Sequence, residues 1–371
     1  MTIVRVPFMT LTPGEDRDAI AAAIDRVVAR GWFVLGPEVE RFEAAFAEAT
    51  GARHAIGVGN GTDALTLILR ALGIGPGDEV ITTPLSAAYT ALAITMAGAR
   101  PVFADIDPRR FTIDPERIAS AIGPRTRAIL PVHLYGQAAD MAAIERLAST
   151  HGLAVVEDCC QAHLATAGGR PVGTIGVAGA FSFYPTKNLG ALGDGGAVVT
   201  NDAALADRIK RLRNGGQTDR YHHSDLGVNS RLDEVQAAVL LERLRWLREW
   251  TERRRELAAG YRQALAGAPV AVPSPCDEGH VYHLFVVRTG DRRTLQAHLA
   301  ARGVETLVHY PVPIPQQPAF APFAATDCPV AVRVSNEVLS LPLYPRMTHD
   351  DIAIVSAAVG DAAPERNPCE R

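Results

Sequence analysis

Residues 182–196 read SFYPTKNLGALGDGG and contain a single cation, Lys187. An apolar run, Val177 to Phe183, leads into this segment, and a second strand-like run, Ala197 to Thr200, follows its glycines. We therefore predict two buried strands joined by a short loop that presents Lys187. The glycines of this loop let a flat ligand approach the backbone, because they lack a side chain. An amine held on such a loop is suited to attack a carbonyl carbon.

A second glycine turn lies upstream, where residues 59–65 read GNGTDAL. This turn leads into a predicted helix, whose first N–H groups have no partner within the helix. The N–H groups of Gly61 and Thr62, together with the hydroxyls of Thr62 and Ser182, therefore suit an anion such as a phosphate. No acidic residue follows at the spacing of a dinucleotide-binding motif, so a nicotinamide cofactor is disfavoured.

The carboxylate that completes the set is Asp158, at the end of an apolar run. Because side chains alternate along a strand, we expect Glu157 on the opposite side. Phosphate anchor, strand-end acid and loop lysine occur in this order and predict a site for pyridoxal 5'-phosphate. In such a site the lysine forms a Schiff base with the cofactor and the acid pairs with the pyridinium nitrogen. We therefore predict that Lys187 and Asp158 are catalytic, with Lys187 also moving the proton between carbon atoms.

Short β-like runs alternate with helical runs from His54 to Leu153. This alternation predicts an α/β fold with a mainly parallel sheet that is covered on both faces. Ligands of such sheets bind beyond the carboxyl ends of the strands. Asp158 and the turn at Gly59 are both expected at such ends.

The chain is long enough for two lobes. We predict a large cofactor-binding domain at residues 1–251 and a small α+β domain at residues 252–371, with a frayed tail from about residue 362. A long helix that opens at residues 230–233 leads from the large lobe into the small one.

Other element boundaries follow from turn and capping residues. The first helix is predicted to begin at the capping pattern of residues 12–15 and to end near Gly31. In the small lobe we expect strands at residues 283–287 and 305–309 and a final helix capped by Thr348.

Several classes of protein are disfavoured by composition. The formal net charge of −4 argues against a general nucleic-acid or membrane-surface binder. No apolar run reaches the roughly 20 residues of a membrane span, and the N-terminus lacks a signal pattern, so we expect a cytoplasmic protein.

Five scattered cysteines without CxxC spacing indicate neither a disulfide framework nor a zinc site. Adjacent histidines rarely chelate one ion by themselves, so we predict a substrate-facing loop at His222 and His223 and no metal site.

From about Gly31 to about Ile352 the chain resembles the DegT/DnrJ/EryC1/StrS family of pyridoxal-phosphate-dependent sugar aminotransferases. The motifs that carry the resemblance are GPEVE at 36–40, the turn at 59–65, EDCCQAH at 157–163, the lysine loop, GVNSRLDE at 227–234 and HYP at 309–311. The resemblance implies the aspartate-aminotransferase-like fold, fold type I, with a seven-stranded-type sheet in the large domain.

The resemblance also implies an activity. Relatives transfer an amino group from an amino acid, most simply glutamate, to a keto group of a dTDP-, UDP- or GDP-linked deoxysugar in amino-sugar biosynthesis. Two alternatives stay open: a cyclitol ketone as the acceptor, and a pyridoxal-phosphate-binding regulatory protein without catalysis. The sequence specifies neither the sugar carbon nor the nucleotide.

Further site residues follow from the resemblance. Gln161 matches the position near the phenolic oxygen of the cofactor. Asn229 matches the position that reaches the cofactor phosphate of the neighbouring subunit, which implies a homodimer with a shared active site. In many relatives an aromatic residue or histidine stacks on the cofactor ring where this chain has Ala87 or Ala88. The substrate-binding candidates are Tyr89, His163, Tyr221, His309 and Tyr310.

Overall fold

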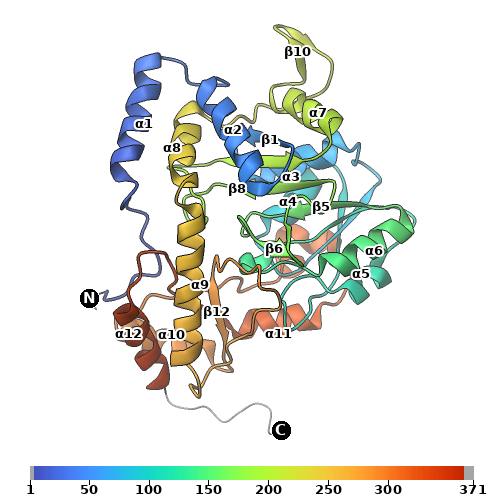
Figure 1. Cartoon of the computed structure of the whole chain (residues 1–371). Coiled ribbons are helices and arrows are strands. Elements are labelled where there is room, and N and C mark those ends of the chain that lie inside the picture. Colours follow the sequence, from blue (N-terminus) through green and yellow to red (C-terminus); the bar gives the residue numbers. More distant parts are fainter. Residues whose placement is uncertain (1–3, 363–371) are drawn as a thin grey trace.

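The computed structural model describes residues 4–362 and has one large sheet at its centre (Figure 1). Its strands lie in the order β1-β9-β8-β5-β4-β2-β3. Their bounds are β1 His54–Val58, β2 Glu79–Thr82, β3 Arg100–Phe103, β4 Thr126–Leu130, β5 Ala154–Asp158, β8 Ala178–Ser182 and β9 Gly196–Thr200. Strand β9 runs antiparallel to β1 and β8, and the other pairs are parallel. The predicted mainly parallel sheet is confirmed.

Helices cover both faces of this sheet. On one face Val156 of β5 packs with Leu65 and Ile68 of α3, and on the other face Val155 packs with Ile144 of α6. The helices of this part are α1 Arg17–Arg30, α2 Pro37–Thr50, α3 Gly61–Ala71, α4 Tyr89–Met96, α5 Pro115–Ala121, α6 Met141–His151, α7 Ala203–Arg213 and α8 Glu234–Leu244. The alternation of buried residues along β5 therefore decides which face of the sheet each following side chain meets.

The C-terminal part is built around a two-stranded antiparallel sheet. This sheet consists of β12 Phe285–Arg288 and β13 Val338–Leu341. Helices α9 Leu247–Ala264, α10 Arg292–Ala301 and α12 His349–Gly360 contribute to a separate apolar cluster with it, and α11 Pro329–Glu337 lies beside them (Figure 1). The proposed domain boundary at residues 251 and 252 falls inside α9, so the chain passes between the two parts on a continuous helix.

The remaining elements are short. They are η1 Leu134–Gly136, β6 Thr166–Ala167, β7 Arg170–Pro171, β10 Gln217–Asp219, β11 His222–His223, η2 Ile314–Gln316 and η3 Pro318–Phe323. Within residues 4–362, no helix has the length and apolar character needed to span a bilayer. The predicted frayed tail lies outside the described residues, apart from Ala362 at its start.

Two predicted boundaries are wrong because side chains make contacts that a local pattern does not reveal. The first helix begins at Arg17, since Asp16 accepts a hydrogen bond from the N–H of Gly14 and holds residues 14–16 in a turn. The long helix predicted from residue 230 is two helices, α8 and α9, and the Ser230 hydroxyl donates to Asp63 instead of capping α8.

The small-lobe predictions are partly confirmed. Thr348 caps α12 in a reciprocal capping box with Asp351, as predicted. The strand expected at 305–309 is wrong, because this segment forms only an isolated bridge between Leu307 and Ser340. Strand β13 lies beside β12 instead, and no turn residue precedes it because it follows α11 directly.

A buried carboxylate fastens α2 to α8. Glu234, fully buried at the start of α8, accepts hydrogen bonds from the N–H groups of Gly36, Glu38 and Val39 at 2.9, 3.0 and 2.9 Å. These groups lie at the N-terminus of α2, where helical N–H groups have no partner within the helix. Glu234 therefore caps a helix that lies about 200 positions away in the sequence.

We expect Glu234→Ala to lower the free energy of unfolding by about 3 kcal/mol or more, because it leaves three buried donors without an acceptor. Chemical denaturation of the variant and the parent measures this difference. Glu252→Ala is the matched control, since Glu252 is 67% exposed and pairs with Arg255 on the surface of α9. The control should change stability by less than about 0.5 kcal/mol. Equal effects of the two variants would contradict the capping role.

Candidate active site

The two adjacent carboxylates at the end of β5 face opposite sides of the sheet. Glu157 is enclosed in protein and accepts hydrogen bonds from three backbone N–H groups, those of Gly173, Ile175 and Gly176, at 2.7–2.9 Å. It also meets His133 Nε2 at 3.0 Å. Such a set of donors replaces the water that a buried carboxylate loses. Glu157 therefore anchors the strand end and is not available to a ligand.

Asp158 points the other way and has different partners. Its Oδ2 accepts a hydrogen bond from the Thr90 hydroxyl at 2.8 Å, and its Oδ1 accepts one from the N–H of Cys160 at 3.1 Å. Both donors are neutral, and Asp158 forms no ion pair among the described residues. The carboxylate is thus oriented by its neighbours while its charge is left for a cation.

The structure gives no reason to place a metal here. The ligand atoms of His133, Glu157 and Cys159 lie within 4.8 Å of one another and are all buried. However, His133 is held between Glu157 and the N–H of Ala139, and Glu157 is saturated by backbone donors. This arrangement is a satisfied polar cluster of the core.

The loop between β8 and β9 presents Lys187, as predicted. The N–H of Lys187 donates to the Tyr184 carbonyl at 2.8 Å, and the N–H of Ala191 donates to the Phe183 carbonyl at 2.7 Å, which closes the loop. The next residue, Asn188, donates through Nδ2 to the Val281 carbonyl at 3.2 Å and contacts His283 Nδ1 at 3.1 Å. The loop is therefore held to the C-terminal part beside its lysine.

The environment of Lys187 favours its free amine. Burial lowers the pKa of Lys187 from its ordinary value of 10.5, and the nearby groups of Cys160 and Asp158 oppose this shift. A lowered pKa increases the fraction of unprotonated amine near neutral pH, which is the form that attacks a carbonyl. The only other lysine of the chain is Lys210, whose side chain is 45% exposed on α7.

The predicted phosphate cradle lies next to these groups. Asn60 caps α3 by accepting from the N–H of Asp63, and the helix begins at Gly61. A Cβ atom added at Gly61 would lie 2.7 Å from Cys160 Sγ and 2.9 Å from Ser182 Cβ. The start of α3, the segment after β5 and the end of β8 therefore converge on one small space. Its N–H groups and hydroxyls have the chemistry needed to hold a phosphate.

Gln161 connects this region to the HYP motif. Its Oε1 accepts a hydrogen bond from the N–H of Tyr135 at 2.8 Å, and its Nε2 donates to the Tyr310 hydroxyl at 2.8 Å. His309 lies beside them: its Nδ1 meets the Ser340 hydroxyl at 2.9 Å and its ring stacks on Phe8. Burial lowers the pKa of His309 to about 4, with a smaller effect of Lys187, so the imidazole is neutral near pH 7.

The other candidates are placed differently. His163 is fully buried against Phe181 and Phe183, and burial lowers its pKa to about 3. We correct its assignment to substrate binding, because an enclosed core imidazole cannot reach a substrate. Tyr89 at the start of α4 and Tyr221 in the β10–β11 hairpin are 64% and 77% exposed.

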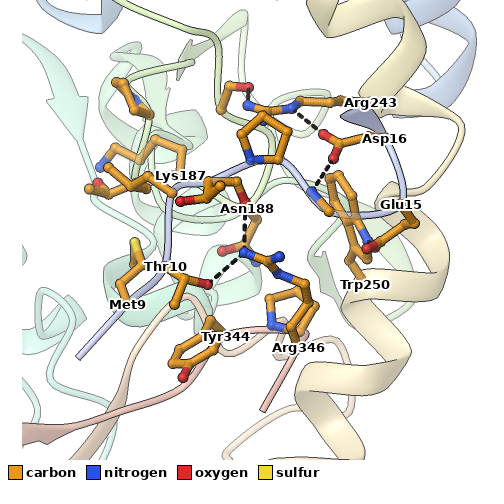
Figure 2. A pocket seen from close by; sticks show the side chains of 18 of the residues that line it. Met9, Thr10, Glu15, Asp16, Lys187, Asn188, Arg243, Trp250, Tyr344 and Arg346 are labelled. Atoms are coloured by element: carbon orange, nitrogen blue, oxygen red, sulfur yellow. Dashed lines mark hydrogen bonds and ion pairs between the residues drawn. The ribbon is translucent and has the colours of Figure 1, made fainter. Parts of the chain in front are cut away.

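Lys187 also lines a pocket of about 620 Å³, part of which is open to solvent. Figure 2 shows Lys187 and Asn188 on one side of this pocket, with Met9 and Thr10 of the N-terminal segment near them. The remaining lining residues are Leu11, Thr12, Pro13, Gly14, Glu15, Asp16, Pro185, Thr186, Gly190, Arg243, Trp250, Arg254, Tyr344, Pro345 and Arg346.

Three side chains from distant parts of the sequence, Arg243, Trp250 and Arg346, fix the N-terminal wall of the pocket (Figure 2). Arg346 donates to the Thr10 hydroxyl at 3.0 Å and to the Thr12 carbonyl at 2.6 Å. Arg243 pairs with Asp16 at 2.8 Å, and the Trp250 indole N–H donates to Glu15 at 2.6 Å. Sequence reasoning missed this wall, since its partners lie more than 220 positions away and carry no local pattern.

The profile of the DegT/DnrJ/EryC1/StrS aminotransferase family matches residues 15–360. The chain belongs to this family. A relative from Streptomyces venezuelae, a dTDP-3-amino-3,4,6-trideoxy-α-D-glucose transaminase, is 49% identical over 366 residues, which cover 97% of this chain and 96% of the relative. The predicted family and the transaminase class are confirmed.

Solved structures agree with this assignment. Crystalline S. venezuelae DesV in complex with a ketimine intermediate has a TM-score of 0.95 at 48% identity, covering 98% of this chain and all of DesV. NtdA from Bacillus subtilis, solved with bound cofactor PMP, has a TM-score of 0.89 at 33% identity, covering 97% of this chain and 85% of NtdA. The predicted fold of the family, an α/β fold of the aminotransferase type, is confirmed.

We expect Gly61→Ala to weaken the affinity for pyridoxal 5'-phosphate about tenfold or more, because the added methyl group fills the cradle between Cys160 and Ser182. Equilibrium dialysis followed by absorbance of the bound cofactor measures this affinity. Gly360→Ala is the control, since nothing lies within 4 Å of a Cβ atom at Gly360. Unchanged affinity in the Gly61 variant would refute the cradle.

Proposed function

We propose that the chain binds pyridoxal 5'-phosphate through Lys187 and transfers an amino group from glutamate to the keto group at C3 of a dTDP-linked deoxysugar. The observation that carries this proposal is the convergence of the Lys187 amine, the Asp158 carboxylate and the cradle at Gly61. These groups come from three separate segments of the chain, and together they match the chemical parts of the cofactor.

Each residue has a task in this proposal. When bound, pyridoxal phosphate supplies an electron sink for the electrons left behind when a proton leaves the substrate carbon. Asp158 favours the protonated ring nitrogen by direct charge interaction. Hydrogen bonds from the Thr90 hydroxyl and the N–H of Cys160 fix the orientation of that carboxylate. Gly61, Thr62 and Ser182 bind the phosphate.

Lys187 has two roles that its lowered pKa supports. As a free amine it would bond to the aldehyde carbon of the cofactor with loss of water, and as a base it would accept and return a proton at the reacting carbon atoms. An amine whose pKa lies below its ordinary value performs the acceptor step at a pH closer to neutrality.

The proposed acceptor rests on the relative from Streptomyces. That protein is named for a dTDP-linked 3-amino sugar and is 49% identical to this chain over nearly all of both sequences. We therefore propose a keto group at C3 and dTDP as the nucleotide. The pocket that Lys187 lines in Figure 2 is the proposed position of the sugar ring.

We further propose that the protein is a cytoplasmic homodimer with a shared active site. Asn229 is exposed and its side chain has no hydrogen bond within the described chain, although it matches a position that in relatives reaches the partner's cofactor phosphate. Trp32 and Phe33 are 55% and 51% exposed in the segment between α1 and α2. Exposed aromatic residues of this kind are typical of subunit contacts.

The direct test is an assay of glutamate with a panel of ketones: dTDP-, UDP- and GDP-linked 3-keto and 4-keto sugars, and a cyclitol ketone. We expect the dTDP-linked 3-keto sugar to be aminated fastest. Lys187→Ala should reduce the rate of this amination by more than about a thousandfold, whereas Lys210→Ala should retain the parent rate. Faster reaction of a 4-keto sugar or a cyclitol would correct the acceptor. A cofactor-bound protein whose spectrum no amino acid alters would favour a regulatory role.

Subunit mixing tests the shared site. We expect Lys187→Ala and Asn229→Asp each to be inactive alone, because Asn229→Asp places a negative charge against the partner's phosphate. Unfolding and refolding them together should restore about a quarter of the parent activity, since half of the random dimers are mixed and each mixed dimer has one intact site. Mixing Lys187→Ala with Asp158→Ala is the control and should restore nothing, because both residues act on the cofactor of their own subunit.

A further inference from the structure

The Gln161 amide has a fixed orientation. Its Oε1 faces the N–H of Tyr135 at 2.8 Å, and a backbone N–H can only donate, so the amide oxygen must lie on that side. Its Nε2 therefore faces the Tyr310 hydroxyl at 2.8 Å. Because an amide NH₂ group is a donor only, the Tyr310 oxygen is the acceptor in this contact.

The hydrogen of the Tyr310 hydroxyl is left without a protein acceptor. Among residues 4–362 the hydroxyl has Gln161 as its single hydrogen-bond partner, and there it accepts. The neighbouring Tyr135 hydroxyl donates to the His309 carbonyl and so does not compete for this role. Gln161 Nε2 likewise has a second hydrogen that its contact with Tyr310 does not use. Two donors 2.8 Å apart are therefore available at one place.

This place borders the proposed cofactor site. Tyr310 lies within electrostatic reach of Asp158 and Cys160, and Cys160 Sγ forms a wall of the cradle at Gly61. The pKa of Tyr310 is raised well above its ordinary value of 10, chiefly by burial, although the bond from Gln161 opposes the shift. The hydroxyl consequently stays protonated and able to donate near pH 7.

We propose that Tyr310 donates a hydrogen bond to the phenolic oxygen of the bound cofactor, beside Gln161. This inference rests on the proposed function, because it requires pyridoxal phosphate in the site. It makes Tyr310 a cofactor-contacting residue that sets the charge of the phenolic oxygen, in place of the substrate-binding role suggested by the sequence.

The bond has a chemical consequence for the link between Lys187 and the cofactor. When the cofactor is bound, its phenolic oxygen would accept a hydrogen bond from the protonated nitrogen of that link. A second hydrogen bond to this oxygen, from the Tyr310 hydroxyl, would weaken the hydrogen bond from the nitrogen of the link. Both donors share the same lone pairs and negative charge of the oxygen. Tyr310 would therefore lower the pKa of the link between Lys187 and the cofactor.

The test is a spectrophotometric pH titration of the holoenzyme, in which the visible band reports the protonated link. We expect Tyr310→Phe to raise the apparent pKa of this band by about one unit, with the cofactor still bound. Tyr135→Phe is the matched control, because its hydroxyl belongs to the same network but donates to His309. Tyr184→Phe controls for an exposed tyrosine of the lysine loop. Both controls should titrate as the parent does.

The outcomes separate this inference from the proposed function. If the parent binds pyridoxal phosphate without a visible band, the proposed function fails. If the parent shows the band and Tyr310→Phe titrates unchanged, only the present inference is overturned. A variant with an unchanged titration and a raised KM for the keto sugar would assign Tyr310 to the substrate and would equally overturn it. Far-UV circular dichroism and cofactor stoichiometry of Tyr310→Phe establish that the comparison is made on folded holoenzyme.

Discussion

The geometry of the candidate active site depends on the different environments of two adjacent carboxylates at the end of β5. Successive side chains of a strand point to opposite faces, so Glu157 and Asp158 cannot share an environment. Glu157 enters the protein interior, where three N–H groups and His133 compensate for lost hydration. A buried carboxylate so fully bonded cannot turn, and its neighbour Asp158 is thereby fixed on the face that carries α3.

The sheet order brings the remaining groups to the same edge. Strands β1, β5 and β8 run in one direction, and their carboxyl ends lead to Gly61, Cys160 and the lysine loop, respectively. Strand β9 returns antiparallel between β1 and β8, so the lysine loop is a short turn at this edge. Close approach is required here, since a Cβ atom at Gly196 would lie 2.4 Å from the backbone of Asn60. The convergence of these groups is thus a property of the topology.

Much of this was predictable, because the decisive information is local. The apolar runs that end in Asp158 and flank Lys187, and the turn before α3, each specify an element and a chemical group. Side-chain contacts between distant segments were not predictable. One example is the hydrogen bond from Ser230 to Asp63, because of which Ser230 does not cap α8 as predicted. Another is the ion pair between Arg243 and Asp16, which helps to form the wall of the pocket. His163 illustrates the same limit: its motif suggested an active-site residue, whereas its burial against Phe181 and Phe183 depends on the fold.

The use of lysine in the chain has a practical consequence. Positive charge is carried almost entirely by arginine, whose guanidinium stays protonated and does not react readily with aldehydes. Lys210 is the single lysine side chain outside the lysine loop, and it lies beside Asp207 on α7. Excess aldehyde during purification or crystallisation therefore meets very few competing side-chain amines. A preparation saturated with pyridoxal phosphate should stay chemically uniform, with its colour arising from one position in the polypeptide.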